Sequence, residues 1–152
     1  YQKLVVEEMK TKPKSGNIVT EDGEILGKHT GLFNYTIGQR KGLGIAYKHP
    51  LYVIGFNGER NEVIVGPNDR LFTNRMICKF YNFLDDTIHK ELKAEGKIRY
   101  AANPSSCTAR ILDDDTMEVI FEEPQRAITP GQSVAFYNGT QLLGGAVIDR
   151  VC

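Results

Sequence analysis

Residues 50–66, PLYVIGFNGERNEVIVG, decide the fold class of this chain. Two apolar runs, LYVIGF and EVIVG, flank the polar stretch NGER, and Asn-Gly between apolar runs is a strong signal for a β-hairpin. We therefore predict two strands joined by a turn at Asn57-Gly58, and no helix across residues 51–65.

The same signal occurs twice more, at Asp22-Gly23 in NIVTEDGEILG and at Asn138-Gly139 between SVAFY and QLLGGAVI. These dipeptides tolerate the positive φ that tight hairpin turns demand. The runs GKIRY, CTARIL and TMEVIFE are also short and bounded by turn residues. Short strands at regular spacing predict a small barrel or sandwich. We expect a mainly β fold, with no parallel sheet anywhere.

A turn-rich stretch, GPNDRL at residues 66–71, divides the chain. We predict a small hairpin-based domain over residues 16–70 and a six-stranded antiparallel β-barrel over residues 71–152. Residues 1–9 have apolar side chains at helical spacing, which predicts a short helix within a helix and linker over residues 1–15. Residues 82–94, NFLDDTIHKELKA, are predicted to form a loop with one helical turn at most.

Composition excludes some functions and leaves others open. The 152 residues contain 19 Lys and Arg against 19 Asp and Glu, so nucleic-acid binding would have to rest on charge asymmetry. No acidic residue occurs from Ile25 to Gly58, where four cations are present: Lys28, Arg40, Lys41 and Lys48. On charge alone, this segment could face phosphate or be an ordinary solvated face. No apolar run approaches the ~18 residues of a membrane-spanning helix, so we expect no membrane association.

The glycine-rich stretch YTIGQRKGLGI, residues 35–45, places Gln39, Arg40 and Lys41 among three glycines. Its G-x-x-x-G-x-G spacing matches neither the dinucleotide fingerprint nor the Walker loop. Two interpretations remain open. The stretch is a mobile surface loop, or it is a backbone-rich surface that approaches an anion.

We find no catalytic or metal-binding arrangement in the sequence. Cys78, Cys107 and Cys152 lie far apart without a CxxC motif and are predicted to be small buried hydrophobes. The three histidines lack metal-ligand spacing, and the serines lack an elbow-type context. Asp113, Asp114 and Asp115 lie between two predicted strands, which favours a solvated hairpin turn over a cation site.

Two spots suit contact with a ligand. Arg99 and Tyr100 end the run KIRY, so as neighbours on a strand they should point to opposite faces, one of them outward. An Arg beside an aromatic residue suits phosphate contact and base stacking. Gln132 follows a predicted turn at Pro130-Gly131 and offers an amide donor and acceptor at a strand entrance. The alternative, which the residues alone slightly favour for the first pair, is an edge-strand Arg99 and a half-buried barrel Tyr100, and Gln132 would then be merely exposed.

Five segments, taken in order, resemble the C-terminal half of the bacterial tRNA-specific 2-thiouridylase family (MnmA): GKHTGLFNYTIGQRKGLGI, PLYVIGF, NEVIVG, KIRY and RAITPGQSVAFYNGTQLLGGAVI. The resemblance implies a central linker domain and a barrel similar to domain 2 of elongation factor Tu. It also implies a preceding ATP pyrophosphatase-type domain, absent here, with a phosphate loop, two catalytic cysteines and bound ATP with Mg. That enzyme, in the cytoplasm, adenylates C2 of the wobble uridine of certain tRNAs and then transfers persulfide sulfur to make 2-thiouridine.

The resemblance also assigns residues and partners. It implies that Arg99, Tyr100 and Gln132 contact tRNA, and that the loop with Gln39, Arg40 and Lys41 faces either RNA or the absent catalytic domain. Nothing makes Cys107 the sulfur carrier. Because the phosphate loop and both required cysteines belong to the absent domain, we expect this fragment to be inactive alone and to bind no cofactor. The implied partners are tRNA and a sulfur-relay donor protein, with no DNA. A stand-alone RNA-binding module or a protein-docking module remains the alternative.

Overall fold

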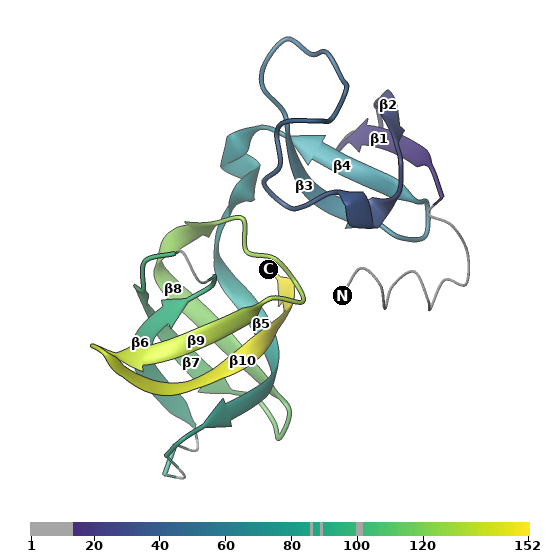
Figure 1. The fold of residues 1–152 in the computed structure, drawn as a ribbon. Coiled ribbons are helices and arrows are strands. Elements are labelled where there is room, and N and C mark those ends of the chain that lie inside the picture. Colours follow the sequence, from purple (N-terminus) through teal and green to yellow (C-terminus); the bar gives the residue numbers. More distant parts are fainter. Residues whose placement is uncertain (1–13, 86, 89, 100–101) are drawn as a thin grey trace. The chain divides into compact units, whose positions relative to one another are not determined.

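The computed structural model describes residues 14–85, 87–88, 90–99 and 102–152. The helix predicted over residues 1–9 lies outside the described residues. The described chain contains ten strands and two short 3-10 helices (Figure 1). It separates into two compact units, one ending at Leu71 and one beginning at Phe72.

The first unit is a four-stranded sheet with the strand order β2-β1-β4-β3. The two predicted hairpins are confirmed, and their strands are β1 (Gly16–Thr20), β2 (Ile25–His29), β3 (Tyr52–Asn57) and β4 (Glu62–Gly66). The 3-10 helices are η1 (Leu32–Asn34) and η2 (Asn68–Leu71). The core of this unit combines strand residues with two side chains from the β2–β3 connection, Leu43 and Leu51.

One pairing in this sheet contradicts the expectation of no parallel strands. β1 and β4 are parallel, with Ile18 opposite Val63. A parallel pair needs a connection of roughly a dozen residues or more, and residues 30–51 between the hairpins supply it. Because Ile18 and Val63 are both fully buried, this arrangement joins the apolar residues of the two hairpins in one core.

Positive φ angles occur where two of the three turn dipeptides predict them. Gly23 has φ 90° and Gly139 has φ 62°. The third hairpin also forms, but its turn extends from Gly58 to Asn61, and Asn61 rather than Gly58 has the positive φ, 55°. Asparagine tolerates this conformation better than most side chains, and the Asn61 amide donates to the carbonyls of Lys14 and Ser15.

The second unit is a closed barrel with the order β10-β5-β8-β7-β6-β9. Its strands are β5 (Phe72–Phe83), β6 (Glu91–Lys97), β7 (Ser105–Ile111), β8 (Thr116–Arg126), β9 (Ser133–Asn138) and β10 (Gln141–Val151). All six neighbouring pairs are antiparallel. The predicted mainly β fold with a six-stranded antiparallel barrel is therefore confirmed. Alternate residues such as Met117, Val119 and Phe121 point inward and fill the core.

Two strands differ from the sequence prediction. β5 was not predicted, because its run FTNRMICKFYNF has polar and apolar residues in no simple alternation. β6 begins at Glu91, within the predicted loop, and ends at Lys97. Closure of the barrel explains this position, since β6 fills the space between β7 and β9, with Leu92 opposite Ala109 and Gly96 opposite Phe136.

Candidate functional site

Arg99 lies in a bend two residues beyond the end of β6, so the prediction that it ends a strand is wrong. Its Nη2 donates to the carbonyl oxygens of Arg126, at 2.6 Å, and Ala127, at 2.9 Å. Ala127 has a positive φ of 58°, and the guanidinium satisfies two carbonyls at the point where the chain turns away from β8. Nε and Nη1 of the exposed Arg99 have no hydrogen bond to another described residue.

Gln132 directly precedes β9, as the strand-entrance prediction requires. Its main chain is held on both sides, because Gln132 N donates to Thr129 O at 3.2 Å and Ile148 N donates to Gln132 O at 2.8 Å. Gly131, with φ 90°, allows the turn and donates to Ile148 O at 2.7 Å. The Gln132 side chain is exposed, and its amide forms no hydrogen bond within the described part of the chain.

The structure brings Arg99 and Gln132 to one end of the barrel. β6 and β9 are antiparallel neighbours with Lys97 opposite Ala135. The end of β6 therefore lies beside the start of β9, and Arg99 follows the one while Gln132 precedes the other. Residues 126–132, here called the rim segment, connect them: they include the carbonyls that Arg99 holds and the Thr129 hydroxyl that donates to Ala127 O at 2.9 Å. Tyr100, the third predicted contact, lies outside the described residues.

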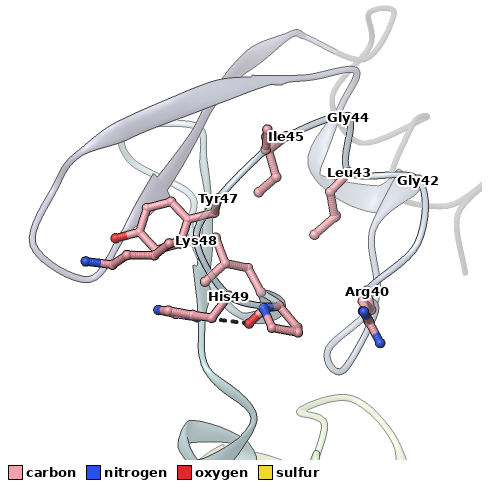
Figure 2. A pocket seen from close by; sticks show the side chains of 11 residues that line it. Arg40, Gly42, Leu43, Gly44, Ile45, Tyr47, Lys48 and His49 are labelled. Atoms are coloured by element: carbon pink, nitrogen blue, oxygen red, sulfur yellow. Dashed lines mark hydrogen bonds between the residues drawn. The ribbon is translucent and has the colours of Figure 1, made fainter.

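In the first unit, the amide of Gln39 is used inside the molecule. Oε1 accepts from Thr36 N at 3.0 Å, and Nε2 donates to Lys41 O at 2.9 Å. Its main chain pairs with β3, where Val53 N donates to Gln39 O at 2.9 Å. Through these hydrogen bonds, Gln39 stabilises the conformation of the loop. Arg40 and Lys41 are exposed, and Figure 2 shows the hollow that begins beside Arg40.

The two buried thiols do not fit a sulfur-carrying role. Cys78 and Cys107 are buried in the barrel core, and burial raises the pKa of each to about 12, so both remain protonated at neutral pH. The prediction of burial holds for these two and fails for Cys152, which is exposed. In the part of the chain that the structure describes, no three His, Cys, Asp or Glu side chains lie close enough to hold a metal ion.

Asp113 forms the predicted hairpin turn between β7 and β8. Its Oδ1 accepts from the backbone N–H groups of Asp115 and Thr116, each at 2.9 Å, and these bonds lower the pKa of the carboxyl. The turn therefore uses one aspartate for its own geometry.

Across the described ranges, no helix is long and apolar enough to span a bilayer.

Comparison with known proteins covers both units. The family model described as the aminomethyltransferase beta-barrel domain matches residues 73–148, and the tRNA methyl transferase PRC-barrel domain matches residues 3–67. A tRNA-specific 2-thiouridylase MnmA 2 of Clostridium botulinum is 46% identical over 93% of this chain and 40% of the relative.

Two other relatives match almost the whole chain. The tRNA-specific 2-thiouridylase MnmA of Clostridioides difficile is 43% identical over 99% of this chain and 42% of the relative. That of Geotalea uraniireducens is 44% identical over 99% of this chain and 40% of the relative. This chain thus spans about 40% of the length of the curated relatives it matches. Since the family models account for the sheet unit and the barrel unit in turn, the chain belongs to the tRNA-specific 2-thiouridylase (MnmA) family.

Proposed function

We propose that this chain is the tRNA-binding C-terminal portion of an ATP-dependent tRNA-uridine 2-sulfurtransferase, working in the cytoplasm. The observation that carries the proposal is the convergence of Arg99 and Gln132 at the rim segment. Both residues come from motifs that resemble the family's, one follows β6 and the other precedes β9, and both side chains are exposed at one end of the barrel. The names of the relatives support tRNA as the substrate.

The chemistry of the rim suits a folded RNA. Arg99 is anchored through Nη2, which leaves Nε and Nη1 to donate to a phosphate oxygen in a fixed orientation. The Gln132 amide can donate to and accept from a ribose hydroxyl or a base edge. The family resemblance adds the expectation that Tyr100 stacks on a base of the same tRNA.

The sulfur chemistry is assigned to another part of the protein. In this proposal a preceding domain binds ATP with Mg, adenylates C2 of the wobble uridine and accepts persulfide sulfur from a relay donor. The two buried thiols, Cys78 and Cys107, are unsuited to carry that sulfur, because burial raises the pKa of each to about 12. Accordingly, the 152-residue chain by itself is expected to form no 2-thiouridine.

The test is a binding titration of the purified chain with unfractionated bacterial tRNA, followed by fluorescence anisotropy. We expect the double variant Arg99→Ala/Gln132→Ala to bind at least tenfold more weakly than the parent at low salt. The control is Arg60→Ala/Gln141→Ala, which removes the same side-chain types from other exposed positions and should bind like the parent. Equal binding by both variants would reject the rim as the contact surface, and absence of tRNA binding by the parent would favour a protein-docking module.

A further inference from the structure

Residues 40–51, here called the glycine loop, form a closed loop on the first unit. Its two ends are tied together where Gly38 N donates to Val53 O at 2.8 Å and Val53 N donates to Gln39 O at 2.9 Å. Leu43 and Leu51 anchor it in the core of the unit. A compact loop whose ends meet and whose own side chains pack beneath it is an ordered surface, frequently a functional one.

The main chain of the glycine loop is open to a ligand. Among the described residues, no peptide N–H group of residues 40–51 donates a hydrogen bond to the protein. Gly42 and Gly44 have positive φ angles of 80° and 66°, so the chain turns there without side chains that would cover the backbone. Unused N–H groups in a glycine-rich turn can bind an anion.

The side chains of the loop add positive charge without compensation. Arg40, Lys41 and Lys48 are exposed, and none forms an ion pair with a described residue. The absence of any acid from Ile25 to Gly58 leaves no carboxylate in the surrounding sequence to compensate them. The three cations therefore face solvent without an acidic partner among the described residues.

An aromatic group lies beside these cations. The Tyr47 and His49 rings meet edge to face with centroids 5.0 Å apart, and Lys48 Nζ lies 5.7 Å from the Tyr47 ring centroid. Figure 2 shows these three residues together on one side of a hollow of about 530 Å³, with Arg40 on the other side. The hollow thus combines two exposed cations, Arg40 and Lys48, with an exposed ring.

We propose that the glycine loop is a second RNA-contact site, which binds the sugar-phosphate backbone of the tRNA that the rim segment contacts. This inference rests on the proposed function. Arg40, Lys41 and Lys48 would neutralise phosphates, the open N–H groups of Gly42 and Gly44 would donate to phosphate oxygens, and the Tyr47 ring would offer a stacking surface. Gln39 would shape the loop through its bonds to Thr36 and Lys41.

The composition of the loop favours RNA over a protein domain as its partner. Protein interfaces have an apolar centre and are depleted of lysine. Within residues 40–51, all of which the structure describes, Tyr47 is the only exposed large hydrophobic residue, whereas two lysines are exposed. A surface of this kind should bind a phosphate-bearing partner more tightly than an apolar one.

The test compares two triple variants of the 152-residue chain in titrations with unfractionated tRNA at several salt concentrations. The loop variant is Arg40→Gln/Lys41→Gln/Lys48→Gln, and the control is Arg60→Gln/Lys90→Gln/Lys93→Gln, which changes the net charge equally at other exposed positions. Each lost phosphate contact lowers the slope of log K against log salt by about 0.7–0.9. We expect the loop variant to lose about two in slope and at least tenfold in affinity at low salt, and the control to change the affinity less than threefold.

Lysine acetylation provides a second measurement on the unmutated chain. Bound tRNA should slow the modification of Lys41 and Lys48 at least threefold and leave Lys93 unaffected. If the loop variant binds like the control, or the two lysines are not protected, the inference is overturned. Failure of the loop variant to weaken binding while Arg99→Ala/Gln132→Ala does weaken it would overturn this inference alone. A parent chain that binds no tRNA would overturn both proposals.

Discussion

Arg75 on β5 donates from Nε to Glu118 Oε2 on β8 at 2.6 Å. On the other side, Arg110 on β7 donates from Nη2 to Glu118 Oε1 at 2.9 Å. The Glu118 side chain is only 6% exposed, because the two guanidinium groups cover it on the outer wall of the barrel. One carboxylate thus ties three neighbouring strands together.

Glu118→Gln should lower the free energy of unfolding by about 1–3 kcal/mol, since hydrogen bonds to charged groups are lost while both half-exposed arginines can regain water. Urea denaturation followed by circular dichroism measures the change. The control is Asp149→Asn, which breaks the more exposed Lys79–Asp149 pair and should cost less than about 1 kcal/mol. An equal loss of unfolding free energy for the two substitutions would show that the burial of Glu118 does not strengthen its ion pairs.

Gly16→Ala should destabilise the first unit. A Cβ at this position would lie 2.2 Å from Asn61 O and 2.7 Å from His29 Nε2, and these two atoms already form a hydrogen bond at 2.7 Å. We expect a loss of about 1–3 kcal/mol in urea denaturation, as for other overpacked sites. Gly58→Ala is the matched control, because a Cβ there meets nothing within 4 Å, and it should be neutral or stabilising by up to about 1 kcal/mol.

Thiol labelling should distinguish the three cysteines. Iodoacetamide at pH 8 should modify exposed Cys152 in the folded chain, and should modify Cys78 and Cys107 only after denaturation, because burial raises the pKa of both to about 12. Mass spectrometry of peptides reads the result. A folded-state pKa above the ordinary 9.0 also means that these thiols contribute stability below pH 9 that is lost as the pH rises above it. Rapid labelling of Cys107 in the folded chain would contradict this prediction and show that its thiol is reactive.

Phe80→Asn should stabilise the barrel. Phe80 has a positive φ of 53° and is 67% exposed, so its side chain pays a conformational cost while it buries little. Asparagine adopts this conformation more readily, and we expect a gain of about 0.5–1 kcal/mol. Phe72→Asn, also at an exposed position of β5 but with an ordinary backbone, should instead destabilise. A lower melting temperature for Phe80→Asn would indicate that the exposed ring makes a stabilising contact.

Substitutions at the rim should separate charge from geometry in tRNA binding. Arg99→Ala should lower the salt slope by about one contact, whereas Arg99→Lys should keep the slope and bind more weakly, because lysine cannot hold the carbonyls of Arg126 and Ala127 in the same way. Titrations at several salt concentrations, with thermal melts to verify folding, measure both effects.

The two other predicted contacts should respond differently. Gln132→Ala should cost about 0.5–1.5 kcal/mol of binding free energy, as for one neutral hydrogen bond. Tyr100→Ala should cost roughly 1–3 kcal/mol and leave the salt slope unchanged if its ring stacks on a base. Parent-like binding by all the rim variants would show that the residues carried over from the family are merely exposed.

The sequence by itself determined the features that depend on near neighbours. The hairpins at Asp22-Gly23 and Asn138-Gly139 follow from turn residues between apolar runs, and the inward positions of Met117, Val119 and Phe121 follow from the period-2 apolar pattern of β8. The family could also be recognised from motifs alone, and the turn at Pro130-Gly131 predicted Gln132 at a strand entrance. Each of these features depends on a few consecutive residues.

Only the tertiary structure decided the features that depend on distant partners. β1 lies parallel to β4 because apolar faces of two separate hairpins share one core, and β6 forms where barrel closure requires a strand. Arg99 lies beyond the end of β6 and donates to the carbonyl of Ala127. The Gln39 side chain accepts from Thr36 N, and its main-chain carbonyl accepts from Val53 N. No local sequence pattern predicts these contacts. They are stabilised by apolar burial and by hydrogen bonds between residues far apart in the sequence, which come together only in the folded chain.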